Sequence, residues 1–420
     1  MREKQIELEQ RQTEKKYGKF KMITMAAIVA FICSLYILNY SEKYNIISQG
    51  LFALSLALTM LKLLVNTHCF YKDYTFYAFV FMVVYNFISS FWVVCGTGVS
   101  EFLQTFTLLS LFYFVLRVNI NSEKDFRVIL WAVIVGTLIM CFYTILFYGP
   151  ARILSAFVTA ERIGSEVNQA NGMGAYCAMA AVIMIYFIAM EKKKLLIPFL
   201  LIDLLILFAT GSRRAIMIII VCSVVFLVMY KKKGRVRRFL LLVCAVLILY
   251  QIIQMLAPSN YFFYRLAQSL QIFGDDSEAL TDGSLITRMS FYELAFKLFL
   301  KKPIFGHGPV QFEYYYYMLY GLRRPPHSTY MQILVGYGAL GFSVFYGMYV
   351  YLTVKAYKAV KALRKYAVLI LSLMILLIVN DFAANYLTNK CLYLFLGLCA
   401  SYFTIDIKED DTQLKNTKTE

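Results

Sequence analysis

The sequence predicts an all-α polytopic membrane protein with about twelve transmembrane helices and one large extracytoplasmic loop that contains an amphipathic helix. Hydrophobic residues make up 60% of the 420 residues and charged residues only 16%. The mean hydropathy is +0.63. Apolar runs of about 20 residues, which can cross the ~30 Å hydrocarbon layer as helices, recur from end to end. The alternating pattern of outer-membrane strands is absent from the sequence.

The predicted spans follow these apolar runs. In chain order they lie near 20–39, 46–65, 74–94, 101–116, 128–148, 171–190, 195–210, 214–230, 238–257, 329–354, 366–383 and 391–404. The chain then divides into a cytoplasmic N-terminal segment at 1–19, nine transmembrane helices in 20–257, a large extracytoplasmic loop at 258–328, three transmembrane helices in 329–404 and a cytoplasmic tail at 405–420.

Basic residues set the predicted orientation, because short cytoplasmic loops of membrane proteins collect Lys and Arg. The amino end and the loops at 191–194, 231–238 and 355–365 are rich in them, whereas SEKYN, CGTGVSE and ANYLTNK are nearly free of them. Both termini are therefore predicted to be cytoplasmic. The same pattern accounts for the net charge of +17, so nucleic acid is not an expected partner.

Neither a leader peptide nor a cysteine framework is predicted. The first span follows a long charged segment and has no small-residue cleavage site after it, which favours a retained anchor. The nine cysteines are dispersed, mostly within spans and without a CxxC pair. They are interpreted as small buried hydrophobes, and no metal site is predicted.

The loop at 258–328 is too long for a linker in a compact bundle. Its segment 284–302 is predicted to be an amphipathic helix, ended by Pro303 and supported by a Glu293–Lys297 pair. Apolar residues recur there at spacings of three and four, at Leu285, Met289, Tyr292, Phe296 and Phe299. Such a helix would lie in the membrane interface or cover the top of the bundle. The acidic stretch 274–284 is interpreted as a solvated loop rather than a cation site.

Two arginines break the positive-inside trend. Arg213 and Arg214 lie in TGSRRA, a predicted outside turn. One interpretation is that they reach phospholipid phosphates. The other is that they bind a multiply charged phosphate ligand, because guanidinium offers a rigid bidentate fork.

The three histidines differ in context. His68 lies in a predicted cytoplasmic loop and is interpreted as incidental. His307 is flanked by glycines, which favours a role in shaping a turn. His327 follows Pro325 and Pro326, which restrict the backbone to an extended form before the next helix begins. This would place an imidazole at the mouth of the bundle for proton transfer, with a capping or packing role as the alternative.

Four motifs in order resemble those of the O-antigen ligase and polysaccharide polymerase superfamily. The run from Arg288 to the turn PIFGHG and the run HSTYMQILVGYGALGF resemble its C-terminal signature, and RIGSEVNQANGMGAY and TGSRRA resemble its upstream motifs. The resemblance covers roughly 162–345. It implies an enzyme of the bacterial cytoplasmic (inner) membrane that transfers a glycan from an undecaprenyl-diphosphate carrier to an acceptor hydroxyl on the extracytoplasmic face. No cofactor, nucleotide sugar or metal is implied.

The resemblance also implies roles for individual residues. His327 matches the histidine that activates the acceptor, and Arg213 and Arg288 match the arginines expected to bind the diphosphate together with Arg214. Two positions depart from the family, Ser328 where Asn is frequent and Arg214 where a small residue is frequent. Further residues are expected to line the substrate site: Arg162, Asn168, Asn171 and His307.

The predicted function is a polysaccharide polymerase for capsule, exopolysaccharide or O-antigen that inverts the anomeric centre. Abundant Lys, Ile and Tyr, typical of AT-rich genomes that include many Gram-positive bacteria, favour it over an O-antigen ligase acting on lipid A core. A lipid-linked glycan flippase or other transporter, and a non-catalytic assembly subunit, are the alternatives. Transporters typically consist of two similar halves, and the sequence shows no such internal repeat. The expected partners are the lipid-linked oligosaccharide, the acceptor glycan and membrane lipids, with other polysaccharide-assembly membrane proteins as further candidates.

Overall fold

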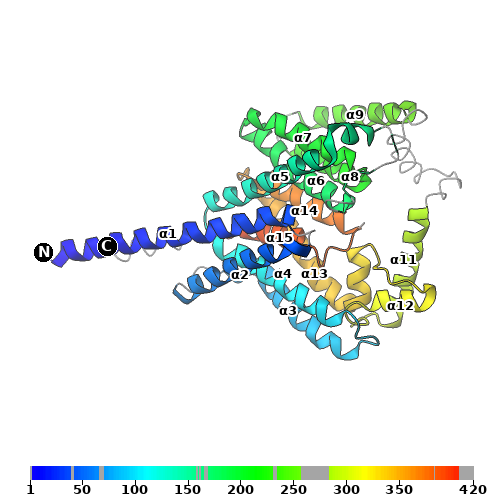
Figure 1. The fold of residues 1–420 in the computed structure, drawn as a ribbon, viewed down its shortest axis with the longest axis horizontal. Coiled ribbons are helices and arrows are strands. Elements are labelled where there is room, and N and C mark those ends of the chain that lie inside the picture. The colour runs from blue at the N-terminus through cyan, green and yellow to red at the C-terminus, as the bar shows by residue number, and fades with distance from the viewer. Residues whose placement is uncertain are drawn as a thin grey trace.

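The computed structural model describes residues 2–38, 42–65, 71–157, 159, 162–164, 169–229, 234–256, 283–382 and 384–405. Within these ranges the chain is helical and contains no strand (Figure 1). The α-helices are α1 (Arg2–Ile37), α2 (Glu42–Val65), α3 (Tyr74–Ser89), α4 (Val99–Asn119), α5 (Glu123–Ser155), α6 (Ala170–Met190), α7 (Ile197–Ala209), α8 (Arg213–Met229), α9 (Arg235–Leu256), α11 (Gly283–Lys301), α12 (Gln311–Tyr320), α13 (Thr329–Lys361), α14 (Ala367–Phe382) and α15 (Lys390–Tyr402). Two short 3-10 helices are η3 (Ser90–Trp92) and η4 (Lys194–Leu196).

Many of these helices can cross a membrane, which confirms a multi-pass helical membrane protein. By length and apolar composition, the described residues hold seven such segments: Gly18–Ile37, Tyr44–Val65, Tyr74–Trp92, Val99–Asn119, Glu123–Ser155, Ala170–Met190 and Thr329–Lys361. Helices α14 and α15 are apolar but shorter. Twelve spans are not confirmed, so the other predicted spans stay predictions, as does the side of the membrane on which the large loop lies.

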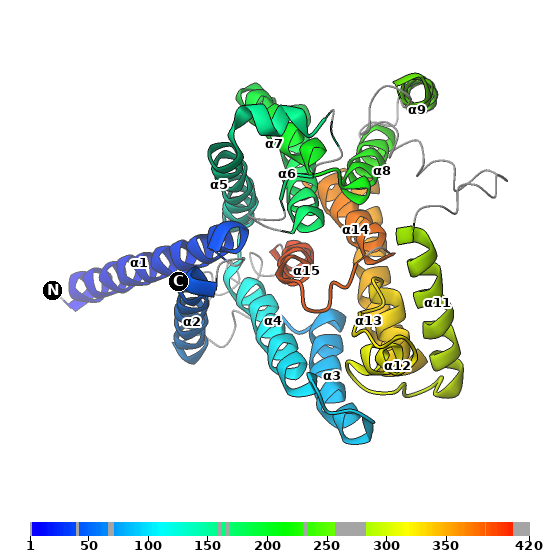
Figure 2. The same cartoon turned by 45° about the vertical axis from the view of Figure 1, so that its right-hand side comes forward.

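Helix α15 forms the centre of the bundle, where Figure 2 shows it surrounded by other helices. Every residue from Cys391 to Tyr402 is buried. A buried arginine in the last turn of α4 fastens it in place. The Arg117 guanidinium donates to the carbonyl oxygen of Ala400 at 2.6 Å and pairs with the Asp73 carboxylate at 3.1 Å. The buried charge is thus both paired and hydrogen-bonded, as burial requires.

A tight turn at 303–308 completes a break in α13. The helix is interrupted at Gly338, where φ is 62° and ψ is −165°. Four backbone hydrogen bonds join the turn to the break: His307 N–H to Val335 O at 2.8 Å, Gly308 N–H to Gly336 O at 2.8 Å, Ala339 N–H to Pro303 O at 2.7 Å and Leu340 N–H to Ile304 O at 3.2 Å. They satisfy backbone groups that the break would otherwise leave open inside the bundle.

Glycines make this close approach possible. A Cβ on Gly306 would lie 2.5 Å from the backbone of Gly336, and one on Gly338 would lie 2.3 Å from the Ile304 carbonyl oxygen. Both glycines also have positive φ, which other residues rarely adopt. The motif glycines therefore serve the backbone fit of the turn against α13.

The predicted helix at 284–302 is present as α11, and its Glu293–Lys297 ion pair is present too. The face that packs on the protein coincides only in part with the apolar stripe identified in the sequence, because Tyr292 packs against the protein. Phe291, Leu294, Ala295 and Leu298 are buried in a cluster with residues of α12 and α13. Met289 and Phe296 of the stripe are exposed by 60% and 55%. Helix α11 is thus apolar on two faces, one for the protein and one outward.

The loops predicted to share one side of the membrane meet at one end of the bundle. Figure 1 places α11 and α12 at the right, opposite the projecting start of α1, and α11 runs crosswise to α1. Near α11 and α12, the Gln311 side chain accepts from the backbone N–H groups of Val94 and Cys95 at 2.9 and 3.0 Å. Basic loops meet α5 elsewhere, where Lys365 pairs with Glu123 and Lys21 lies 2.8 Å from Asp125. Which end of the bundle faces the cytoplasm stays a prediction.

Candidate functional site

A cavity of about 580 Å³ opens where five segments of the chain meet. Its volume lies within the range of small-molecule sites. The segments are the start of α6, the first turn of α8, the start of α11, the connection before α13 and the loop between α14 and α15. The lining residues are Gln169, Asn171, Gly172, Arg214, Thr287, Arg288, Phe291, Arg324, Pro325, His327, Ala384, Asn385, Tyr386 and Asn389.

The cavity is cationic. Arg214, Arg288 and Arg324 come from three different elements and line it together with His327. None of the described lining residues is acidic. Three guanidinium groups without a carboxylate among them favour a multiply charged anion, and guanidinium binds phosphate oxygens in bidentate fashion.

The turn before α8 positions Arg214. Helix α6 approaches this turn so closely that a Cβ on Gly174 would lie 2.7 Å from the Ser212 Cβ and 2.8 Å from the Thr210 hydroxyl oxygen. From there the Arg214 guanidinium donates to the Asn171 carbonyl oxygen at 3.0 Å. It also lies over the Tyr386 ring, 5.6 Å from the centroid, in a cation–π arrangement. These contacts aim the side chain across the cavity toward the α14–α15 loop.

His327 lies in the connection between Pro326 and α13, as its sequence context predicts. Its φ of 51° is left-handed, which is rare for a residue with a side chain and costs about 1 kcal/mol or more. Its ring lies 5.5 Å from that of Phe291. Burial lowers the pKa of His327 below its usual 6.5, and the charges of Arg288, Arg324 and Arg214 lower it further. At pH 7 the imidazole is therefore neutral and able to accept a proton.

The residues after His327 tie this connection to the α14–α15 loop. The Ser328 hydroxyl donates to the carbonyl oxygen of Asp381 at 3.3 Å. The Thr329 hydroxyl donates to the Ala384 carbonyl oxygen at 2.8 Å and accepts from the Tyr386 backbone N–H at 3.0 Å. Ser328 thus has a hydrogen-bonding role. The loop is held directly against the histidine.

Amide side chains form another part of the wall. Asn385, Asn389 and Gln169 line the cavity beside Tyr386. The Asn389 carbonyl oxygen caps α15 by accepting from the Cys391 N–H at 2.9 Å. The carbonyl oxygen of the Asn385 side chain is buried and has no hydrogen-bond partner among the described residues. Amides that donate and accept beside an aromatic ring suit the hydroxyl groups and apolar faces of sugars.

Four of the predicted site residues do line this cavity, namely His327, Arg288, Arg214 and Asn171. Arg213 is half-buried at the first position of α8 and is not among the lining residues. Successive residues of a helix point about 100° apart, so a one-residue difference decides which arginine faces the cavity. The diphosphate role assigned to Arg213 stays a prediction that the lining does not support.

The other predicted lining residues have different positions. Arg162 donates to the Thr210 carbonyl oxygen at 2.9 Å and to the Asn171 side-chain oxygen at 2.7 Å, so it braces the wall from behind. Asn168 lies outside the described residues, as do His68 and most of the acidic stretch at 274–284.

His307 is a structural residue of the turn rather than a lining residue. It is 3% exposed, and its Nε2 lies 2.8 Å from the Leu298 carbonyl oxygen. Burial lowers its pKa. This arrangement agrees with the turn-shaping role that its flanking glycines predict and removes it from the expected substrate lining.

Sequence reasoning missed several lining residues. Arg324 had a signal, because an arginine pair directly before two prolines and His327 is unusual at the start of an apolar helix. Asn385 and Asn389 had none beyond their place in a short loop of low charge. Their contribution depends on how α14 and α15 pack against α6 and α8.

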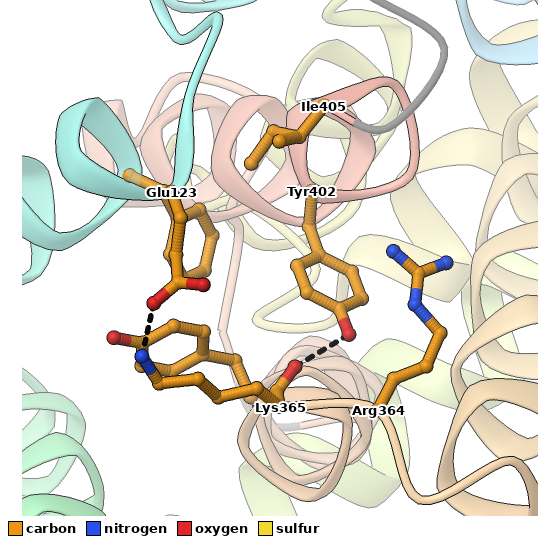
Figure 3. Close-up of a pocket in the computed structure, with 7 residues that line it drawn as sticks. Glu123, Arg364, Lys365, Tyr402 and Ile405 are labelled. Atoms are coloured by element: carbon orange, nitrogen blue, oxygen red, sulfur yellow. Dashed lines mark hydrogen bonds and ion pairs between the residues drawn. The ribbon is translucent and has the colours of Figure 1, made fainter. Parts of the chain in front are cut away.

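Two other cavities lack this chemistry. One of about 670 Å³ is mostly apolar and lies between α3 and the 303–308 turn, lined by Tyr85, Ile88, Trp92, Lys302, Pro303, Ile304, Phe305 and Gly306. Another, of about 220 Å³, lies beside the Lys365–Glu123 ion pair, with Tyr402 donating to the Lys365 carbonyl oxygen (Figure 3). Its two cations, Arg364 and Lys365, share the lining with the acidic Glu123, so it attracts an anion less strongly than the arginine cavity.

Fold and site together define a multi-pass helical membrane protein with a cationic, amide-walled cavity at one end of its bundle. Residues 198–346 match the family described as O-Antigen ligase. This confirms the resemblance over those residues, and it supports an enzyme of the O-antigen ligase and polysaccharide polymerase type. The matched range runs from α7 into α13 and contains Arg214, Arg288, Arg324 and His327. Among curated proteins, none matches the chain.

Proposed function

We propose that the protein is a polysaccharide polymerase that uses undecaprenyl-diphosphate-linked glycan as donor and the sugar hydroxyl of another lipid-linked repeat unit as acceptor. The observation that carries the proposal is the convergence of three arginines and a neutral histidine on one cavity. The active face is extracytoplasmic, both termini are cytoplasmic, and the protein works in the bacterial cytoplasmic membrane.

The proposed reaction is a single displacement with inversion. The acceptor oxygen attacks the anomeric carbon while the bond from that carbon to the diphosphate oxygen breaks. His327 takes the proton of the acceptor hydroxyl, a contribution of typically ~10²–10⁴-fold for a general base. Undecaprenyl diphosphate leaves with the electron pair, and Arg214, Arg288 and Arg324 stabilise the charge that develops on it.

The site supports this division of labour. The arginines and His327 occupy the same cavity, so donor phosphate and catalytic base can act on neighbouring atoms. The arginines also keep His327 unprotonated, because each opposes a second positive charge nearby. The amide wall at Asn385 and Asn389 would hold the sugar beside the reacting carbon.

Reconstituted protein supplied with lipid-linked repeat units tests the function. Wild type should convert them into a ladder of longer lipid-linked products. His327→Ala should lower the rate ~10²–10⁴-fold while binding of undecaprenyl diphosphate persists, because the change removes a base and no cation. His307→Ala is the matched control, since that histidine lies outside the cavity. Near-wild-type rates for His327→Ala would assign the proton transfer to another group.

The acceptor distinguishes a polymerase from a ligase. Both would use the same cation wall for the donor. A ligase would leave repeat units unextended and would need lipid A core to form product. Formation of a ladder from repeat units alone supports the polymerase, whereas product only with lipid A core present supports the ligase.

A further inference from the structure

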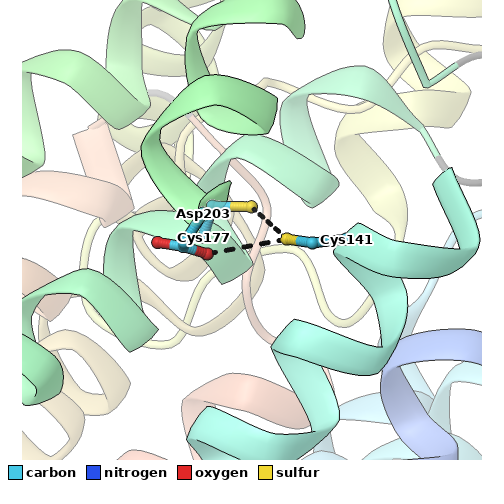
Figure 4. Close-up of side chains that lie close together, drawn as sticks. All are labelled: Cys141, Cys177 and Asp203. Carbon is cyan, nitrogen blue, oxygen red and sulfur yellow. Dashed lines mark hydrogen bonds between the residues drawn. The ribbon is translucent and has the colours of Figure 1, made fainter. Parts of the chain in front are cut away.

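Two cysteines and an aspartate meet inside the bundle, away from the arginine cavity. Cys141 lies on α5, Cys177 on α6 and Asp203 on α7, and Figure 4 shows the three side chains pointing toward one another. All three are fully buried. Their ligand atoms lie within 4.8 Å of one another. The sequence predicts neither the cluster nor a metal site, because the three residues are far apart in the chain.

Two of the three distances between the ligand atoms are close to those of a metal-binding set. The two sulfurs are 3.9 Å apart, and the Cys141 sulfur is 3.8 Å from an Asp203 carboxylate oxygen. Two sulfurs bound to one tetrahedral Zn²⁺ at ~2.3 Å would lie about 3.8 Å apart, and a bound sulfur and carboxylate oxygen about 3.5 Å apart. A sulfur–sulfur distance of 3.9 Å is also far longer than the ~2.05 Å of a disulfide.

The carboxylate is otherwise poorly satisfied. The second Asp203 oxygen, Oδ2, is buried and has no hydrogen-bond partner among the described residues. The ion pairs found within the described ranges do not include Asp203. Ionised, the group would lack a counter-charge, and protonated on Oδ2, it would lack an acceptor. A buried carboxyl with one unsatisfied oxygen is costly, and a bound cation would lower that cost.

We infer that Cys141, Cys177 and Asp203 are three ligands of a Zn²⁺ site that joins α5, α6 and α7. Thiolate and carboxylate are ligands that Zn²⁺ accepts, whereas Mg²⁺ and Ca²⁺ prefer oxygen alone. Binding releases the two thiol protons, because thiolate is the ligand form. The site is independent of the proposed glycosyl transfer.

Full burial implies that zinc enters as the helices assemble. The direct test is therefore the zinc content of full-length protein, produced in zinc-supplemented medium and purified in detergent without a histidine tag. Wild type should carry about one zinc per chain. The double variant Cys141→Ser/Cys177→Ser should carry less than a tenth of that. Cys222→Ser, which changes a buried cysteine of α8 outside the cluster, should retain the full amount.

Cobalt-grown wild type gives a second readout that does not need a variant to fold. Co²⁺ bound by two thiolates should show sulfur-to-cobalt charge-transfer absorption, and Zn²⁺ should compete with it. Wild-type protein without zinc or that absorption would overturn the inference, leaving an aspartic acid surrounded by thiols. Zinc retained in the double variant, or a Cys141–Cys177 disulfide in place of the metal, would overturn it equally.

Discussion

Arg213 and Arg214 are consecutive residues in the first turn of α8, yet only Arg214 lines the cavity that contains His327. The Arg214 guanidinium reaches the Asn171 carbonyl oxygen and the Tyr386 ring on the two sides of that cavity. Substituting each arginine in turn therefore compares a cation that lines the cavity, Arg214, with a neighbouring cation of equal charge that does not, Arg213.

Arg214→Ala should weaken binding of undecaprenyl diphosphate by about 10- to 100-fold, since a hydrogen bond to a charged group contributes ~1.5–3 kcal/mol. Arg213→Ala should change the dissociation constant by much less. Binding to the purified protein in detergent, measured for both variants at one ionic strength, checks this. A larger loss for Arg213→Ala would return the diphosphate role to Arg213.

His327 should titrate below its ordinary pKa of 6.5, because burial and three arginines oppose its protonation. The neutral base is present above the folded-state pKa, so transfer should fall only as pH drops through a value below 6.5. Arg288→Gln removes one opposing charge and should move the His327 pKa upward. NMR of histidine-labelled protein measures this directly, since the chain has three histidines and His327→Ala assigns the signal. An unchanged or lower pKa in Arg288→Gln would contradict the electrostatic account.

Asn385→Ala should raise KM for lipid-linked oligosaccharide by about 5-fold, because one hydrogen bond contributes ~1 kcal/mol. Its binding of undecaprenyl diphosphate without sugar should stay at the wild-type level, since the change leaves the arginines intact. Asn385→Asp retains the acceptor oxygen and should keep more activity than Asn385→Ala. Equal loss of affinity for both ligands would show that the loop supports the arginines instead of the sugar.

Topology provides an independent prediction. Reporters fused after residues 193, 234 and 360 should read as cytoplasmic, and those after 280 and 320 as extracytoplasmic, because basic loops alternate along the chain. The arginine cavity is lined by residues before and after position 320, so the reporter at 320 shows on which side of the membrane the cavity lies. A cytoplasmic signal at 280 or 320 would place the cavity on the wrong side for a lipid-linked donor outside the cell.

Local features of this fold could be predicted from sequence, and features of packing could not. Apolar residues at spacings of three and four, with Pro303 and the Glu293–Lys297 pair, predict α11, and the apolar run after Pro325–Pro326 predicts that His327 precedes a helix. Whether Arg213 or Arg214 faces the cavity with His327 depends on the residue at which α8 begins. Asn385 and the Cys141–Cys177–Asp203 cluster depend on contacts between distant helices, for which a single sequence carries no periodic signal.

The turn at 303–308 and the break in α13 depend on each other and form one structural unit. The backbone of the turn completes the interrupted hydrogen bonding of α13. Without the turn, backbone groups of α13 would lack hydrogen-bond partners, and the turn would lose its own partners without α13. A chimera in which only the large loop comes from a relative would place a foreign turn against the break in α13. The hydrogen bonds between the two would then no longer match. Replacing 303–340 as a whole would carry both halves together. The portion that recombination can pass between relatives is therefore the turn with its broken helix, rather than the loop.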